Sequence, residues 1–365
     1  MGSLEMSRVL PDPNFWANKR VFITGHTGFK GGWLSLWLQS LGACIRGFAL
    51  KPLTEPNLFC MAQVANGMES VIGDILDFER LRNTMIEFNP DIVIHMAAQP
   101  LVRASYKDPV GTYHVNVLGT VHVLEAARQC ENLRVIVNVT SDKCYENKEW
   151  VWGYREEDPM GGFDPYSSSK GCAELVTSAY RRSFLLDAGI GVATVRAGNV
   201  IGGGDWSEDR LVPDILRSFE KGDPAIIRNP KAIRPWQHVL EPLCGYLVLT
   251  EKLWSDPEQF SEGWNFGPND TDIVPVSVIA TQIAELWADG ACWVLDESSH
   301  PHEAVNLKLD VSKARAKLGW GPVWSLGEAL RRIVNWHRAW HRGMDMKELC
   351  LREITEYMEA GRENG

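Results

Sequence analysis

The chain has 365 residues, a formal net charge of −10 at pH 7, 45% hydrophobic residues and 23% charged residues. This composition is typical of a soluble globular protein and argues against disorder, collagen-like repeats and coiled coils. The excess of acidic residues opposes contact with a phosphate backbone, so we expect no nucleic acid partner.

The first half of the chain alternates short apolar runs with longer segments of helical period, a pattern typical of βαβ units on a parallel sheet. The clearest helical segment is 109–129, where Val110, Val117, Val121 and Leu124 recur near helical spacing. We therefore predict an α/β fold with a Rossmann-like, doubly wound parallel sheet. The predicted strands are Arg20–Thr24, Ala43–Leu50, Ser70–Ile72, Ile92–Met96, Arg134–Val139 and Val192–Arg196.

After Arg196 the chain is broken into shorter pieces by turn residues, among them Gly202, Gly203 and Gly204. This pattern of short segments separated by turn residues predicts a smaller, mixed α/β lobe over the open end of the sheet. We assign residues 18–198 with 239–266 to the sheet domain and residues 199–238 with 267–345 to the smaller lobe. A cleft is expected between them.

A glycine-rich turn follows the first predicted strand and leads into a predicted helix. Its glycines recur every third residue, so backbone N–H groups and the positive end of the helix dipole can approach a pyrophosphate. The spacing differs from the common Gly-x-Gly-x-x-Gly fingerprint, and a glycine turn without a ligand is the alternative. The expected dinucleotide contacts in this turn are Gly25, Thr27, Gly28, Phe29, Lys30 and Gly31.

The end of the second predicted strand lacks the acidic residue that ordinarily accepts the ribose hydroxyls, which leaves the choice between NAD and NADP open. Asp74 follows the third strand, where it either accepts from an adenine amino group or caps a helix. Small residues after the fourth strand allow a flat ring or ribose to lie against the backbone. The expected contacts here are Asp74, Ile75, Ala97, Ala98 and Gln99.

Three polar side chains, Ser141, Asp142 and Lys143, follow the fifth strand, at the sheet edge where ligands of open α/β sheets bind. Further on, Tyr166 and Lys170 are four residues apart, so a helix would place both on one face. An ammonium group beside a phenol stabilises the phenolate, as a catalytic base requires. These five residues are the predicted catalytic group.

The order of glycine turn, Ser141, Tyr166 and Lys170 resembles the extended short-chain dehydrogenase/reductase superfamily, from Lys19 to about Trp340. Within it the chain resembles the sugar-nucleotide 4,6-dehydratases, although a lysine stands at the third position of their Ser/Thr-Asp-Glu triplet. The turn Gly25–Gly31 and the segment Ala97–Arg103 are most similar to the members that act on CDP-glucose.

This resemblance implies NAD as cofactor and CDP-D-glucose as substrate. Tyr166 would take the proton of the sugar 4-hydroxyl as hydride leaves C4 for NAD, with Ser141 on the same oxygen and Lys170 on the ribose. Water would then be lost across C5 and C6, and hydride would return to C6 to give CDP-4-keto-6-deoxy-D-glucose. We predict Lys143 as base and Asp142 as acid, an assignment that the sequence leaves open.

The resemblance also implies contacts outside these motifs. Arg234 and Asn199 would bind the diphosphate, since a guanidinium fork suits two phosphate oxygens. Basic residues at 210 and 302 would assist, and Arg103 would line the sugar pocket. The implied substrate contacts are Arg103, Asn199, Arg210, Arg234 and His302, and the remaining cofactor contacts are Asn116 and Thr140 beside Tyr166 and Lys170. No metal is expected.

Other partners follow from composition and resemblance. No apolar run approaches the length of a membrane helix and no secretory signal is apparent, so no membrane association is expected. The eight scattered cysteines predict reduced thiols in a cytoplasm. Helices 109–129 and 166–186 would pair between subunits of a homodimer or homotetramer. The competing hypotheses are a nucleotide-sugar 4-epimerase, which needs no acid and base to expel water, and a non-catalytic NAD-sensing protein.

Overall fold

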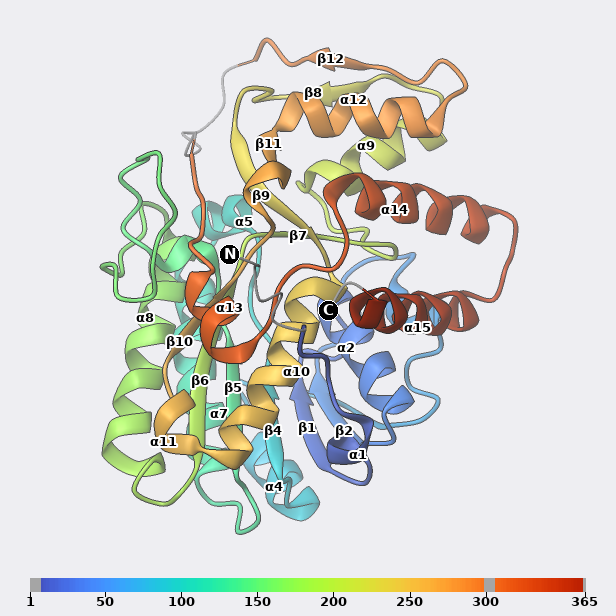
Figure 1. The fold of residues 1–365 in the computed structure, drawn as a ribbon. Coiled ribbons are helices and arrows are strands. Elements are labelled where there is room, and N and C mark those ends of the chain that lie inside the picture. The colour runs from blue at the N-terminus through green and yellow to red at the C-terminus, as the bar shows by residue number, and fades with distance from the viewer. Residues whose placement is uncertain (1–7, 299–305, 364–365) are drawn as a thin grey trace, which may run out of the picture.

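The computed structural model describes residues 8–298 and 306–363. Its centre is a seven-stranded sheet, in which all neighbouring strands run parallel (Figure 1). The six predicted strands are confirmed to within one residue at each end. They are β1 (Arg20–Thr24), β2 (Cys44–Ala49), β3 (Glu69–Ile72), β4 (Ile92–His95), β5 (Val135–Val139) and β6 (Gly191–Ala197), and the seventh, β10 (Gly263–Phe266), was not predicted.

The strand order across the sheet is β10-β6-β5-β4-β1-β2-β3. The chain therefore reverses direction across the sheet between β1 and β4, and this is the switch point at which open α/β sheets bind ligands. The residues that follow β1 and β4 are Gly25 and Met96, so the glycine turn lies at this point.

Alternating side chains on the central strands pack against helices on both faces of the sheet. Val21 and Ile23 of β1 belong to the core shared with α2 (Phe29–Ser40) and α10 (Leu240–Ser255). Phe22 points to the other face, whose core includes the helices α4 (Phe78–Phe88) and α7 (Gly119–Ala127).

The predicted helix 109–129 is present as three consecutive helical segments, α6 (Pro109–Tyr113), the π-helical η1 (His114–Leu118) and α7. The second predicted helix is α8 (Pro165–Tyr180), continued by the π-helical η3 (Arg181–Leu185). Helix α8 lies beside α7 and carries both Tyr166 and Lys170.

Two smaller sheets lie beyond the carboxyl ends of the large sheet (Figure 1). One contains β7 (Asn199–Ile201), β9 (Ile233–His238) and β11 (Ile273–Pro275), and the other pairs β8 (Ala225–Ile227) with β12 (Trp293–Leu295). A separate apolar core joins them to the helices α9 (Leu211–Glu220), α12 (Val276–Trp287) and α14 (Leu326–His341).

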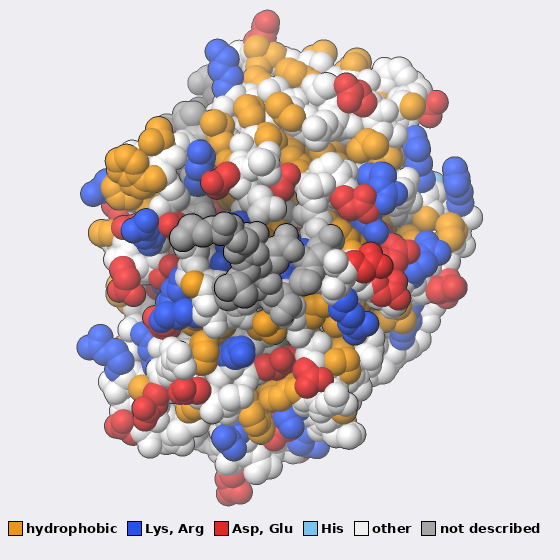
Figure 2. Space-filling view, viewed as in Figure 1, with side chains coloured by type: hydrophobic (Ala, Val, Ile, Leu, Met, Phe, Trp, Pro, Cys, Tyr) orange, Lys and Arg blue, Asp and Glu red, His pale blue; other side chains and the backbone are white. Residues whose placement is uncertain are grey.

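The C-terminal helix α15 (Met346–Glu363) packs against α2, and its Tyr357 donates to Glu241 of α10 at 2.7 Å. Figure 2 shows positive and negative side chains interspersed over one face, without a large patch of one sign. Within the described ranges, no helix is both long and apolar enough to cross a membrane. The remaining helices are α1 (Pro13–Trp16), α3 (Leu58–Met61), α5 (Val102–Lys107), η2 (Asp142–Cys144), α11 (Pro257–Phe260), η4 (Asp270–Asp272), α13 (Ser312–Leu318) and α15 (Met346–Glu363).

Candidate active site

A cavity of about 580 Å³ runs from the glycine turn at the large sheet to the smaller sheets. Its walls come from the ends of β1, β4, β5 and β6 on one side and from β7, β8, β9 and α9 on the other. The cavity thus lies where the switch point of the sheet faces the second part of the chain.

The glycine turn leaves no room for side chains at two of its three glycines. Gly25 has a φ of +80°, and a Cβ there would lie 2.7 Å from the amide nitrogen of Ala97. A Cβ on Gly31 would lie 2.1 Å from the Gly25 carbonyl oxygen. Gly28 precedes α2 and lines the cavity, so the first N–H groups of this helix face the cavity without a side chain between.

Further residues predicted to bind the cofactor surround this turn. Thr27 donates to the Leu50 carbonyl at 2.8 Å, which fixes the turn against the end of β2. Asp74 lines the cavity, and the carboxylate that caps α4 is that of Asp77 instead. The helix-cap alternative for Asp74 is therefore wrong, and its carboxylate accepts from the Leu76 amide at 2.9 Å. Phe29, Ile75, Ala97, Ala98 and Thr140 also line the cavity.

Lys30 extends from the first turn of α2 into the cavity wall, where it is half-buried and its Nζ donates to the Tyr246 hydroxyl at 3.1 Å. Burial lowers the pKa of Lys30 to about 7, with smaller contributions from the positive charges of Arg210 and Lys170. Three basic groups therefore converge on this part of the cavity, a charge balance that suits an anionic ligand.

Ser141, Asp142 and Lys143 leave the end of β5 as a turn of 3-10 helix. Lys143 and Ser141 line the cavity, whereas the Asp142 side chain lies behind them and is buried. Ser141 donates to Asp142 Oδ1 at 3.0 Å, while Oδ2 has no partner among the described residues. Burial raises the pKa of Asp142, against opposing effects of Lys143 and Ser141.

Tyr166 and Lys170 reach the same cavity from α8, as their spacing predicted. Burial raises the pKa of Tyr166 to about 12, although a hydrogen bond with Ser141 lowers it. The Lys170 Nζ donates to the Val139 carbonyl at 3.3 Å, and burial lowers its pKa to about 8, against the charge of Glu174. A phenol, an ammonium group and a serine hydroxyl thus line the same cavity.

Asn116 and Gln99, which were predicted to contact the cofactor, lie behind the wall of the cavity. Asn116 accepts from the Gln99 amide at 2.9 Å and donates to the Gln99 carbonyl at 3.1 Å and to Ser169 at 2.9 Å. Asn116 lies in the π-helical η1, a distortion that often marks functional sites. The Asn116 side chain thus connects the Gln99 backbone, beyond the end of β4, to α8, and neither Asn116 nor Gln99 lines the cavity.

The opposite wall is rich in guanidinium groups. Arg210 forms an ion pair with Asp205 at 3.1 Å, and Arg103 forms one with Asp209 at 3.2 Å. Arg228, which the sequence did not indicate, also pairs with Asp209 and follows the short strand β8. The predicted substrate residues Arg103, Asn199, Arg210 and Arg234 all line the cavity, and His302 lies outside the described residues.

The residues present fit a dinucleotide. The two glycines whose Cβ positions are blocked by backbone hold the turn close to the start of α2, and the N–H groups there are available to a pyrophosphate. The basic group of Lys30 adds positive charge at the same place.

The chain is similar to known proteins in both sequence and structure. The family model described as GDP-mannose 4,6 dehydratase matches residues 22–333. The chain is 61% identical over 354 residues to a CDP-glucose 4,6-dehydratase of Salmonella typhimurium, covering 96% of this chain and 99% of that protein. An epimerase of Methanothermobacter thermautotrophicus is similar in structure, with a TM-score of 0.78, 24% identity and coverage of 90% and 95%. MoeE5 in complex with UDP-glucose and NAD has a TM-score of 0.75, 25% identity and coverage of 88% and 99%.

Proposed function

We propose that this chain, which belongs to the GDP-mannose 4,6-dehydratase family, converts CDP-D-glucose to CDP-4-keto-6-deoxy-D-glucose with NAD as its cofactor. The observation that carries the proposal is the identity with the Salmonella enzyme over nearly the whole of both chains. The cavity adds chemical support, because it brings Tyr166 and Lys170 to the turn that holds Asp142 and Lys143.

NAD would be held by the glycine turn, Asp74 and Lys170, and it supplies a hydride acceptor and a positively charged ring when bound. The first step needs a base at the sugar 4-hydroxyl. The Tyr166 phenol keeps its proton in the buried site, since its pKa is about 12. The positive charge of Arg210 lowers this pKa. We assign the same effect to the Lys170 ammonium, which favours the phenolate that removes the hydroxyl proton. The Ser141 hydroxyl, next to Tyr166, would bond to the same sugar oxygen.

Loss of water then needs a second base and an acid. The C5 proton is acidic once C4 is a ketone, and we assign its removal to Lys143, which lines the cavity wall. The 6-hydroxyl leaves as water once a proton reaches it, and we assign this proton to Asp142, which lies behind the cavity wall and would pass it through the hydrogen-bonded hydroxyl of Ser141. Burial raises the pKa of Asp142, which is the direction that a proton donor requires. A 4-epimerase requires neither group.

The diphosphate would bind to the guanidinium groups of the opposite wall. Arg234 is buried and lines the cavity at β9, and Arg210 lines it at the start of α9. We also assign Arg228 to this group, because it lines the same wall. In this arrangement residues 18–198 with 239–266 hold the cofactor, and residues 199–238 with 267–345 hold the sugar nucleotide.

We further propose a homodimer or homotetramer in which α6, η1, α8 and η3 meet a second copy. These helices expose large apolar side chains, with Val110 64%, Leu118 42%, Leu175 62% and Phe184 46% exposed. Light scattering should report a monomer for Leu175→Glu and an oligomer for the wild type. A cytoplasmic location accords with eight free cysteine thiols.

The proposed reaction is tested by incubating the purified protein with NAD and, in turn, CDP-, UDP- and dTDP-glucose. A product lighter by one water, with the base-induced absorbance of a 4-keto-6-deoxy sugar, is expected from CDP-glucose. A product of unchanged mass with inverted C4 would identify a 4-epimerase instead. Absence of turnover with all three would contradict the proposal.

A further inference from the structure

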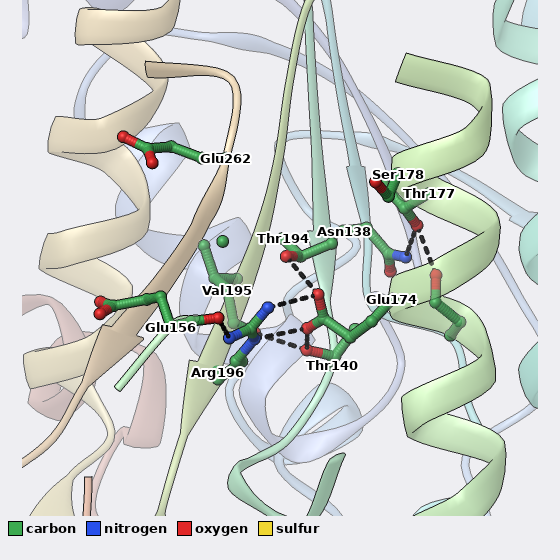
Figure 3. Close-up of polar contacts among 12 residues, drawn as sticks. Asn138, Thr140, Glu156, Glu174, Thr177, Ser178, Thr194, Val195, Arg196 and Glu262 are labelled. Atoms are coloured by element: carbon green, nitrogen blue, oxygen red, sulfur yellow. Dashed lines mark hydrogen bonds and ion pairs between the residues drawn. The ribbon is translucent and has the colours of Figure 1, made fainter. Parts of the chain in front are cut away.

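A buried ion pair lies next to the candidate active site but outside its cavity. Glu174 of α8 and Arg196 of β6 are in contact at 2.8 Å, and each side chain is 5% exposed. Figure 3 shows the Glu174 carboxylate between the end of β5 and β6, facing the Arg196 guanidinium. Neither residue lines the cavity.

The Glu174 carboxylate connects three elements of the fold. It accepts from the hydroxyl of Thr140 at 2.5 Å and from that of Thr194 at 2.6 Å, in addition to the two nitrogens of Arg196 at 2.8 Å (Figure 3). Thr140 directly precedes Ser141, and Glu174 follows Lys170 by one helical turn. One carboxylate therefore joins the helix that carries Tyr166 and Lys170 to the start of the Ser141 turn.

The other side of Arg196 holds the far end of the same turn. Its Nη1 donates to the Tyr145 hydroxyl at 2.6 Å and to the Glu156 carbonyl at 3.0 Å. Tyr145 directly follows η2 and donates in turn to Asn265 of β10 at 2.7 Å. The turn that contains Asp142 and Lys143 is thus fixed at both ends, through Thr140 by Glu174 and through Tyr145 by Arg196.

The charge of Glu174 also acts on Lys170. Burial would raise the pKa of Glu174, but Arg196 and the hydrogen bonds of Thr140 and Thr194 hold it below its usual range, so this carboxyl stays ionised. Its charge opposes the effect of burial on Lys170, whose pKa is about 8. The other titratable groups that act with Lys170 are Lys30 of α2, His95 of β4 and Cys144 of η2.

We propose that Glu174 and Arg196 are positioning residues of the dehydration reaction, which hold the acid and base turn in register with the helix of Tyr166 and Lys170. The pair touches neither the cavity nor the reacting atoms. This inference rests on the proposed function, because it is the dehydration reaction that requires the Asp142 and Lys143 turn to stay at a fixed distance from Tyr166 and Lys170. A misplacement of about 1 Å can reduce a rate by about a hundredfold.

The test separates positioning from stability with two variants. Glu174→Gln leaves Arg196 as an unpaired buried charge and is expected to lower Tm. The double variant Glu174→Gln/Arg196→Met replaces the pair by uncharged groups, so it should recover much of that Tm. Glu241→Gln is the matched control, because Glu241 is equally buried and hydrogen-bonded to Tyr357 but lies outside the cavity.

We expect both Glu174 variants to lose at least about tenfold in kcat for CDP-glucose, with KM changed by no more than about twofold. The alkaline limb of the kcat profile should move to lower pH, because Lys170 loses the negative charge that favours its ammonium form. Glu241→Gln should lower Tm while keeping the wild-type kcat and pH profile. Wild-type kcat in the double variant would overturn the proposal.

Amide hydrogen exchange tests the same inference without any substrate. Residues 140–145 should exchange at least about tenfold faster in the double variant, and at the wild-type rate in Glu241→Gln. Unchanged exchange over 140–145 would overturn the positioning role even if CDP-glucose is turned over. Conversely, faster exchange in a protein without dehydratase activity would uphold the structural connection and refute only the proposed reaction.

Discussion

Replacing Gly31 with alanine should separate the glycine turn from α2 by a distance that the structure defines. The new Cβ would lie 2.1 Å from the Gly25 carbonyl oxygen, whereas real Cβ atoms essentially never approach another atom within 3.0 Å. Both partners belong to the backbone, so the turn and the helix must part by about 0.9 Å. Overpacking of this kind costs about 1–3 kcal/mol, and we expect a fall in Tm of roughly 2–10 °C.

NAD binding should suffer more than stability does. Displacement of the turn removes backbone hydrogen bonds to a charged phosphate, each worth about 1.5–3 kcal/mol, so one lost bond weakens the Kd by roughly 10–100-fold. Calorimetric titration with NAD and thermal unfolding of the apoprotein measure the two effects. Both are independent of which sugar nucleotide is the substrate.

Gly327 provides a matched control, since it is the second residue of α14 and a Cβ there would find its nearest neighbour, Ser325 Oγ, at 4.0 Å. Gly327→Ala should raise stability by up to about 1 kcal/mol through helix propensity and leave NAD binding unchanged. A Gly31→Ala protein that binds NAD with wild-type affinity would refute the assignment of the glycine turn as the pyrophosphate site.

Three further outcomes are expected. Lys143→Met should still oxidise the sugar slowly at C4, seen as absorbance of the reduced cofactor, but form no dehydrated product and incorporate no solvent deuterium at C5. Arg234→Ala should raise the KM for CDP-glucose by roughly 10–100-fold, the value of one charged hydrogen bond, without changing NAD affinity. The destabilisation caused by Glu241→Gln should be larger below pH 4.5 than above pH 7 by up to about 3 kcal/mol, because burial raises the pKa of Glu241 from 4.5 to about 7. The folded wild type binds the Glu241 proton more tightly than the unfolded chain does, so the free energy of unfolding of the wild type falls as the pH rises from 4.5 to about 7. Denaturant titrations at each pH would measure this change.

Each of these expectations has a result that contradicts it. Dehydrated product from Lys143→Met at the wild-type rate would remove Lys143 as the base. An unchanged KM in Arg234→Ala would place the diphosphate elsewhere on the arginine-rich wall. A penalty for Glu241→Gln that is independent of pH would show that folding does not raise the pKa of Glu241.

The large sheet was predictable from sequence because each of its first six strands is a distinct apolar run. The seventh strand was missed, since Gly263–Phe266 is only four residues long, contains Asn265 and comes after the part of the chain that forms the smaller sheets. Its place beside β6 depends on pairing with a strand distant in sequence, which local patterns do not report.

The site was predictable where chemistry follows a fixed spacing, as for Tyr166 and Lys170, which do line one cavity. Which of the predicted side chains reach the cavity was not predictable. Asp142 is buried behind the cavity wall, and its position depends on how η2 packs. Glu174 and Arg196 gave no signal either, because a charged residue in a helix or strand is ordinarily solvent-exposed. Only the packed structure shows that they are buried together.

The path of the chain between the large and the smaller sheets has a consequence for unfolding. The chain leaves the large sheet after β6, returns through α10 after β9, and leaves again after β10. The smaller sheets are therefore interwoven in sequence with the large sheet that carries the glycine turn. Limited proteolysis should release no autonomous fragment, and a single calorimetric transition is expected, because neither part can complete its core without segments on both sides of these crossings.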